Sequence, residues 1–327
     1  MKLITGLNPY GLSYMLGIQG KDTPRCNPSP KALDDFIALT LELGGKAIEL
    51  WDGWLKTVAD AELAGLRKRL EGLGWTRILS TGLQHCDMDM LLRCAEALDA
   101  RLIRLALTPI LCGDRAAAGQ RWHELVQSVH DKLSAYAPRA AGAGVTLLIE
   151  NHQDFTSREL VALCEQYGPS VRIAFDMANT IPVADAPLDF TQIIAPYVRF
   201  CHLKDYRVQF TEDGLRLVRC PTGDGCVPHG EMFDMLAGYH DEMLACIEIG
   251  ALEARHVRLF TQGWWQGYAP VAAEQLAACL RAAQRNRLPE GADWRTPWER
   301  NADDELMEYE LAHYRRSAEN MKALGLM

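Results

Sequence analysis

The 327-residue sequence lacks the patterns that mark membrane, secreted and nucleic-acid-binding proteins. No apolar run approaches the roughly 18 residues of a membrane span, and the start MKLITGLNPYGLSY predicts a strand and a loop rather than a signal peptide. The ten cysteines include no C-x-x-C pair. We therefore expect reduced, mostly buried thiols in a cytoplasmic protein, although Cys220 and Cys226 are near enough in the chain to pair. A formal charge of −9 disfavours a nucleic-acid partner, which would need a Lys/Arg surface.

Short apolar runs rich in β-formers alternate with longer amphipathic segments at intervals of roughly 25–45 residues. Repeated βα units predict a parallel sheet, and eight of them within about 250 residues predict a single (β/α)8 TIM barrel. The alternative is an open doubly wound sheet, but no G-x-G-x-x-G follows the first strand. The expected strands are 2–7, 46–51, 76–82, 101–108, 145–151, 171–176, 198–205 and 244–250.

The last part of the chain has a different composition. Residues 251–327 are rich in Trp, Arg and Glu and show no strand run. We expect 270–288 to supply the eighth helix, so that 1–288 forms the catalytic barrel and 289–327 a C-terminal helical extension. The amphipathic segment 302–325 predicts a final helix that packs on the barrel or on a second subunit, and we expect a homo-oligomer.

Four successive predicted strands end in a side chain that can bind a hard metal ion. These are Glu150, Asp176, His202 and Glu248, at spacings of 26, 26 and 46 residues. In a parallel barrel such strand ends share one rim. Each residue alone is more often structural, but buried carboxylates are normally paired or bound to metal. Together they predict a divalent-metal site, with Mn²⁺ the best match and Mg²⁺, Co²⁺ or Zn²⁺ as alternatives.

Two further candidates lie close to these ligands. His152 is two residues beyond Glu150 and Lys204 two beyond His202, so each shares a face with its neighbour. Both are candidate acid–base or oxyanion-stabilising groups. The alternatives are a loop histidine and a structural ion pair between Lys204 and Asp205.

Other candidates are substrate contacts. Glu49 ends the second strand and His85 follows the third, so both are expected to point toward the same mouth. A tight turn is expected at 223–225, the sequence GDG, beside the site. A sugar-stacking wall is expected from tryptophans, although a tryptophan is more often simply packed: Trp51, Trp54, Trp264 and Trp265.

The segments LLIENH, IAFDMAN, CHLKD, GDG and CIEIG resemble the strand ends of the xylose-isomerase-like TIM-barrel superfamily, over about residues 1–250. Members of this superfamily include ketose 3-epimerases, sugar isomerases, inosose dehydratases and endonuclease IV. Asn179 stands where ketose 3-epimerases have a histidine, and Arg207 is five rather than six residues after the metal-binding histidine. Both remain candidate substrate contacts. Asn179 also replaces a ligand expected of endonuclease IV, which disfavours phosphodiester hydrolysis.

The resemblance implies a metal-dependent enzyme acting on a small-molecule carbohydrate. Glu150 and Glu248 would remove and return a proton beside a carbonyl. This favours an isomerase or epimerase of a sugar or keto-sugar. The alternative is a lyase or dehydratase performing β-elimination on a 3-keto-glycoside, similar to the large subunits of C-glycoside deglycosidases and accompanied by a small partner subunit. A binding subunit without catalysis is disfavoured because all four ligands are present.

Overall fold

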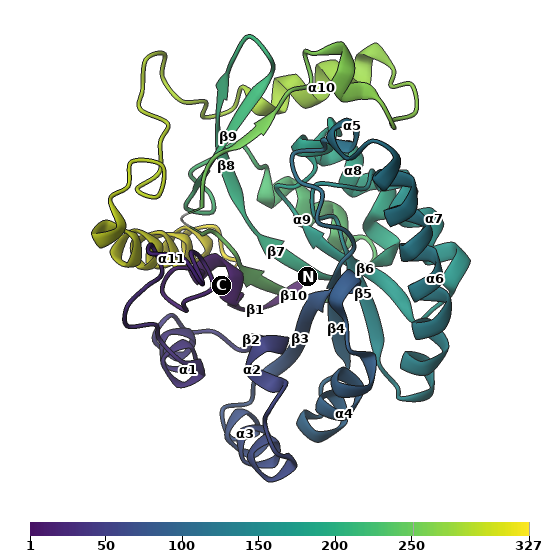
Figure 1. Ribbon diagram of the computed structural model, residues 1–327, viewed down its shortest axis with the longest axis vertical. Coiled ribbons are helices and arrows are strands. Elements are labelled where there is room, and N and C mark those ends of the chain that lie inside the picture. The colour runs from purple at the N-terminus through teal and green to yellow at the C-terminus, as the bar shows by residue number, and fades with distance from the viewer. Residues whose placement is uncertain (251, 327) are drawn as a thin grey trace.

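The computed structural model describes residues 1–250 and 252–326. Eight parallel strands form a closed barrel in the order β1-β10-β7-β6-β5-β4-β3-β2, with helices around it (Figure 1). The predicted barrel is confirmed, and the open doubly wound sheet is wrong because β1 pairs with both β10 and β2. The strands are β1 Lys2–Leu7, β2 Ala47–Trp51, β3 Thr76–Gly82, β4 Leu102–Ala106, β5 Thr146–Glu150, β6 Val171–Asp176, β7 Val198–Leu203 and β10 Glu242–Ile247.

The helices bury one face against the barrel wall. Helix α7 is typical: it follows Thr156, whose N–H and hydroxyl both donate to Glu159, and it ends at Gly168 with φ 78°. No helix among the described residues is both long and apolar enough to cross a membrane. The helices are α1 Leu33–Glu42, α2 Asp52–Leu55, α3 Asp60–Gly72, α4 Met88–Leu98, α5 Arg115–Ala118, α6 Gln120–Gly142, α7 Ser157–Tyr167, α8 Pro187–Ile194, α9 His229–Ala237, α10 Ala273–Ala283 and α11 Leu306–Ala323.

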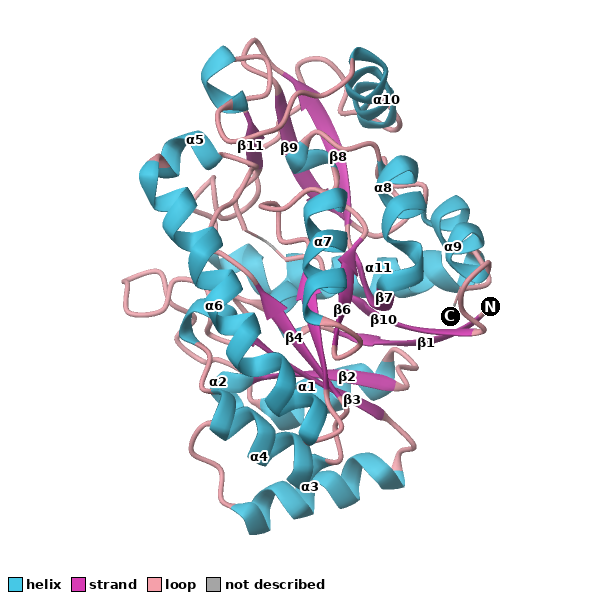
Figure 2. Cartoon of the chain, turned by 90° about the vertical axis from the view of Figure 1, so that its right-hand side faces the viewer, coloured by secondary structure: helices cyan, strands magenta, loops and turns pink. Residues whose placement is uncertain are grey.

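A second, antiparallel sheet stands beyond the ends of the barrel strands (Figure 2). It consists of β8 (Asp205–Phe210), β9 (Leu215–Cys220) and β11 (Arg255–Val257). The expectations of a plain loop after the seventh strand and of no strand after residue 250 are therefore wrong. These strands are short, and β11 pairs with a strand far from it in the chain, so local patterning gives little signal.

The two C-terminal helices lie on different parts of the molecule. Arg285, just after α10, pairs with Glu231 of α9, and the Leu288 N–H donates to the Val208 carbonyl of β8. Helix α10 therefore lies toward the antiparallel sheet. Helix α11, confirmed as the final helix, contacts β10 and the short 3-10 helix η1 (Pro9–Leu12). Its apolar face is covered by this chain's own barrel.

The inside of the barrel holds a small apolar cluster, separate from the larger core between strands and helices. Every barrel strand contributes to it. Such a layer fills the barrel and provides a rigid floor for whatever lies above it. Its members are Ile4, Ala47, Ile78, Leu102, Leu148, Ala174, Phe200, Leu244 and Cys246.

Candidate metal centre

A layer of polar side chains lies directly above this apolar floor. Side chains two residues apart on a strand point the same way, so the residue two beyond each floor residue faces the barrel axis. The ring of His202 packs edge-on against that of Phe200, with centroids 4.9 Å apart. The charged members of this layer, each with its floor residue, are Glu49 above Ala47, Arg104 above Leu102, Glu150 above Leu148, Asp176 above Ala174, His202 above Phe200 and Glu248 above Cys246.

The four predicted ligands come together. Ligand atoms of Glu150, Asp176, His202 and Glu248 all lie within 4.8 Å of one another, and all four side chains are buried. His202 Nδ1 is 3.0 Å from Glu150 Oε1 and 2.9 Å from Glu248 Oε2. Asp176 sits beside His202 in the register of β6 and β7. The site thus focuses three carboxylates and one imidazole nitrogen on one point.

Lys204 introduces a positive charge into the cluster. Its ammonium group lies 2.5 Å from Asp176 Oδ2 and 2.6 Å from Glu248 Oε1. The predicted alternative, an ion pair with Asp205, is absent among the described residues. Asp205 instead accepts the backbone N–H groups of 223, 225 and 227, which shapes the expected turn at 223–225.

Glu49 lies behind the imidazole rather than in the open mouth. Its Oε2 is 2.9 Å from His202 Nε2 and accepts Asn8 Nδ2 at 2.7 Å, while its Oε1 accepts Arg104 Nε at 3.0 Å. Glu49 is fully buried. It therefore orients His202, and a carboxylate in this position is a common partner of metal-binding histidines.

Burial and neighbouring charges compete at this site. Burial raises the pKa of Asp176 to about 6, against the attraction of Lys204. Burial also opposes ionisation of Glu150, but Arg104 and His202 outweigh it and hold its pKa at about 2. For His202 burial disfavours the charged form, yet Glu49 and Glu248 raise its pKa well above the usual range. A positive charge at the centre of the cluster is therefore favourable, because it stabilises the buried carboxylates around it.

The residues present fit a divalent cation. Glu150 Oε2 and Glu248 Oε2 are buried and accept no hydrogen bond from the described residues. Arg104 Nη1 at 3.3 Å and His202 Nδ1 at 2.9 Å are close to them, but neither contact has hydrogen-bond geometry. Two cations, on Arg104 and Lys204, face four carboxylates, which leaves two negative charges in excess when His202 is neutral. Such oxygen-rich sets suit Mn²⁺ or Mg²⁺.

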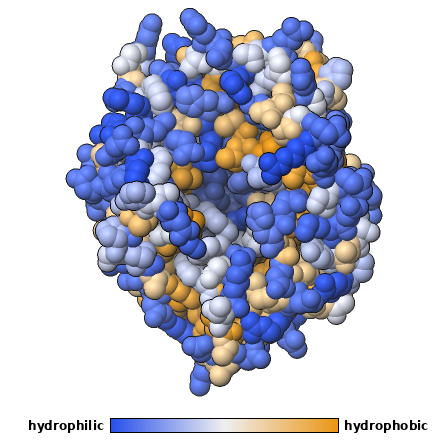
Figure 3. Space-filling model, viewed as in Figure 1, coloured by the Kyte–Doolittle hydropathy of each residue, from blue (hydrophilic) through white to orange (hydrophobic). Residues whose placement is uncertain are grey.

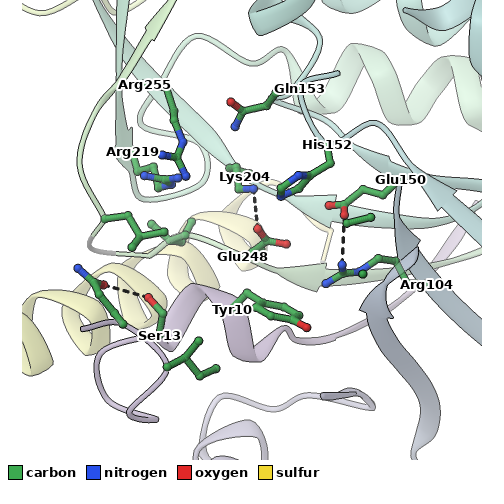
Figure 4. A pocket seen from close by; sticks show the side chains of 16 residues that line it. Tyr10, Ser13, Arg104, Glu150, His152, Gln153, Lys204, Arg219, Glu248 and Arg255 are labelled. Atoms are coloured by element: carbon green, nitrogen blue, oxygen red, sulfur yellow. Dashed lines mark hydrogen bonds and ion pairs between the residues drawn. The ribbon is translucent and has the colours of Figure 1, made fainter. Parts of the chain in front are cut away.

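A cavity of about 370 Å³ opens above the cluster. The space-filling view shows a hollow with a hydrophilic floor near the middle of this face (Figure 3). Glu150, His152, Lys204 and Glu248 all line it, together with Tyr10 (Figure 4). Burial lowers the pKa of His152 to about 4, so its ring is neutral at pH 7. Its Nδ1 has no partner among the described residues.

The other predicted contacts lie outside the cavity wall. Asn179 is buried and donates to Asp176 Oδ2 at 2.7 Å, so it orients that ligand. His85 is exposed, and Arg207 donates to the Asn286 carbonyl and lines a separate cleft. None of the described residues that line the cavity is a tryptophan. The expected sugar-stacking wall is not formed by Trp51, Trp54, Trp264 or Trp265, which pack against other aromatic rings.

Several cavity residues were missed by the sequence reasoning. Arg104 could have been found, because a charged residue in the middle of the apolar run RLIRLALT marks a special position. Tyr10 lies on the short helix η1 and Gln153 on a loop, and neither carries a sequence signal. Arg219 and Arg255 belong to the unpredicted antiparallel sheet. All ten cysteines are free, including Cys220 and Cys226, as expected.

Comparison with known proteins settles the family. Residues 37–258 match the family described as xylose isomerase-like TIM barrel. The chain belongs to this family. It is 36% identical over 87 residues to the uncharacterized protein YihM of Escherichia coli K12, a match spanning 26% of this chain and 27% of that protein. The chain thus matches only about a quarter of the length of this curated relative.

Several solved structures share the fold at low sequence identity. The probable 3-DHS dehydratase AsbF of Bacillus anthracis superposes with a TM-score of 0.55 at 16% identity, over 75% of this chain and 92% of that one. D-psicose 3-epimerase of Clostridium cellulolyticum H10, solved with D-tagatose, superposes with a TM-score of 0.52 at 17% identity, over 95% and 99%. At these identities the likeness establishes the fold alone.

Proposed function

We propose that this protein is a divalent-metal-dependent isomerase or epimerase that acts on a sugar or keto-sugar by removing a proton beside a carbonyl. One observation carries the proposal. Glu150 and Glu248 come from strands separated by two others, yet both approach His202 Nδ1 and both line the cavity. Two carboxylates converging on one small cavity can serve opposite faces of a bound carbon atom.

The four clustered side chains would hold the ion. A bound divalent cation, with Mn²⁺ the best match and Mg²⁺, Co²⁺ or Zn²⁺ as alternatives, would polarise the carbonyl and acidify the adjacent C–H. Neighbouring charges hold the pKa of Glu248 well below its usual range against the opposing effect of burial, and Glu150 is likewise ionised at neutral pH. One carboxylate would take the proton from carbon, and the other, after taking up a proton from solvent water, would return it to the opposite face of the same carbon.

A second candidate is a lyase that eliminates an oxygen leaving group next to the same carbonyl, for example from a 3-keto-glycoside. It is supported by the N–H donors of His152 and Lys204 in the cavity beside Glu248. After a carboxylate removes the proton, such donors can hydrogen-bond the departing oxygen. AsbF, which is described as a probable dehydratase, has a similar fold. If the protein is such a lyase, we expect it to work together with a small partner subunit.

Two wider expectations remain part of the proposal. The ten free thiols suit a cytoplasmic setting. A homo-oligomer is also proposed, through a surface other than the apolar face of α11, which this chain's own barrel covers; analytical ultracentrifugation of the purified chain would measure the oligomeric state.

The decisive experiment is solvent deuterium incorporation into a panel of ketoses and 3-keto-glycosides, using Mn²⁺-loaded protein. Exchange reports proton abstraction whichever way the reaction continues. A product that keeps the substrate's carbon skeleton and has one stereocentre inverted would support the epimerase. An unsaturated product would support the lyase. No exchange into any compound of the panel would contradict both.

Glu150→Gln tests the role of the first carboxylate. The amide keeps an oxygen ligand but cannot accept the proton, so exchange should fall by about 10²–10⁴-fold while metal content falls less. The exposed Glu308→Gln on α11 is the matched control and should behave as wild type. Full exchange in metal-loaded Glu150→Gln would remove the two-base mechanism.

A further inference from the structure

The antiparallel sheet places two arginines on the wall of the cavity. Arg219 on β9 lies opposite Tyr206 on β8, and Arg255 on β11 lies opposite Leu217 on β9. Because side chains alternate along a strand, Leu217 and Arg219 share a face, and Arg255 shares it through its pairing with Leu217. Both guanidinium groups line the cavity, and they lie next to each other above Glu248 (Figure 4).

These two arginines are poorly neutralised by the protein. Arg219 is only 5% exposed and donates to the Glu253 carbonyl at 3.0 Å. Within residues 1–250 and 252–326 no carboxylate lies within ion-pair distance of it. The Arg255 side chain, 11% exposed, pairs with Glu253 Oε1 at 2.8 Å. Its Nε is buried without an acceptor in the described part of the chain.

Two adjacent buried cations, of which only Arg255 pairs with a carboxylate, are electrostatically unfavourable. Burial lowers the pKa of Arg219, and the charge of Arg255 lowers it further. A buried guanidinium donor with no acceptor costs free energy unless a ligand supplies the acceptor. The arrangement therefore calls for an anion from outside the chain.

The cavity thus carries negative charge on its floor and positive charge on its wall. Its floor carries the carboxylates Glu150 and Glu248, and its wall carries Arg219 and Arg255. A volume of about 370 Å³ is at the small end of ligand cavities and suits a molecule of about one sugar ring. A ligand that bridges the two ends would present a carbonyl or hydroxyl to the floor and an anionic group to the wall.

We propose that Arg219 and Arg255 form an oxyanion subsite, which binds a carboxylate or phosphate group carried by the substrate. Guanidinium groups bind both kinds of oxyanion through paired, charge-assisted hydrogen bonds. The substrate is accordingly an acidic sugar derivative, either a sugar acid or a sugar phosphate. This statement about the substrate rests on the proposed function, whereas the oxyanion subsite itself is independent of any reaction.

The test is calorimetric titration of the Mn²⁺-loaded protein, at low ionic strength, with sodium acetate and with inorganic phosphate. Acetamide is the neutral isostere of acetate. At least one anion should bind the wild type, and acetamide should not. Arg219→Gln and Arg255→Gln should each weaken anion binding by about 10-fold or more, the size expected for losing a charge-assisted hydrogen bond. Preference for acetate would indicate a sugar acid, and preference for phosphate a phosphorylated sugar.

Arg216→Gln is the matched control. Arg216 is on β9 too, three residues from Arg219 and therefore on the opposite face, where it stacks on Trp294. It should leave anion binding unchanged. Equal loss in Arg216→Gln, unchanged affinity in the two cavity variants, or no binding of either anion would overturn the subsite. Because no turnover is measured, anion binding without deuterium exchange would retain the subsite and reject only the proposed function.

Discussion

His202 and Glu49 are joined by a contact of 2.9 Å between the imidazole Nε2 and the carboxylate Oε2, both side chains being fully buried. The other ring nitrogen, Nδ1, faces Glu150 and Glu248. With Nε2–H donating to Glu49, Nδ1 is left with its lone pair directed at the ligand cluster. Glu49 therefore selects the tautomer that binds metal.

Replacing Glu49 with Gln should weaken Mn²⁺ binding by about 10–100-fold, the usual effect of losing a carboxylate partner of a metal-binding histidine. The amide is nearly isosteric, so the fold should survive. Titration monitored by the electron spin resonance of free Mn²⁺ would give the affinity, and circular dichroism would check the fold. Unchanged affinity would show that Glu49 does not orient His202.

Lys204 should have the opposite effect on metal binding. Its ammonium group lies against Asp176 and Glu248 and competes with any cation for the same oxygens. Lys204→Met removes this charge, and Mn²⁺ affinity should rise by about 10-fold or more. Turnover should fall, because an N–H donor is lost from the cavity. The exposed Lys68→Met on α3 is the control. Weaker Mn²⁺ binding in Lys204→Met would contradict the competition.

The sequence was sufficient to predict the barrel and the ligand cluster, for one physical reason. Barrel strands are buried on both faces, so each appears as a continuous apolar run, and a charged residue at its end stands out. Glu150, Asp176, His202 and Glu248 were found in this way. The same reasoning, applied two residues beyond Leu102, would have predicted Arg104 as well.

The cavity wall could not be predicted in the same way. Arg219 and Arg255 reach the cavity through the pairing of β9 with β11, strands that are separated by α9 and β10 in the chain. Short strands in such non-local pairs have little local signal. The placement of α10 and α11 depended likewise on tertiary contacts. Of these, the bonds from α11 to the loop after β1 join residues about 300 apart.

Tyr314 on α11 is expected to stabilise the rim of the barrel. Its hydroxyl donates to the Asn8 carbonyl at 2.7 Å, and the Asn8 side chain in turn holds Glu49. Tyr314→Phe leaves this buried carbonyl without its donor, so the free energy of unfolding should fall by about 1–3 kcal/mol. Tyr309→Phe, on the same helix, is the matched control and should change it by less than about 0.5 kcal/mol. Urea denaturation measures the free energy of unfolding of both variants. Equal losses in the two would contradict a stabilising role of the Tyr314 hydrogen bond.

His313 should make stability depend on pH. Burial lowers its pKa to about 4, although Asp224 opposes the shift, and its Nδ1 is buried without a partner among the described residues. In the unfolded chain the pKa of histidine is about 6.5. As the pH falls below that value, His313 becomes protonated in the unfolded chain but stays neutral in the folded chain. Stability is therefore lost between about pH 6.5 and pH 4, and is fully present above that window.

His313→Gln removes this dependence while keeping a polar side chain of similar reach. Between pH 7.5 and pH 5, wild type should lose about 2 kcal/mol more free energy of unfolding than the variant. Comparing the two proteins cancels the carboxylates that titrate in the same range. The exposed His123→Gln on α6 should follow wild type at both pH values. If His313→Gln also followed wild type, the His313 side chain would have to be protonated in the folded chain, and its burial on the inner side of α11 would not resist the charge.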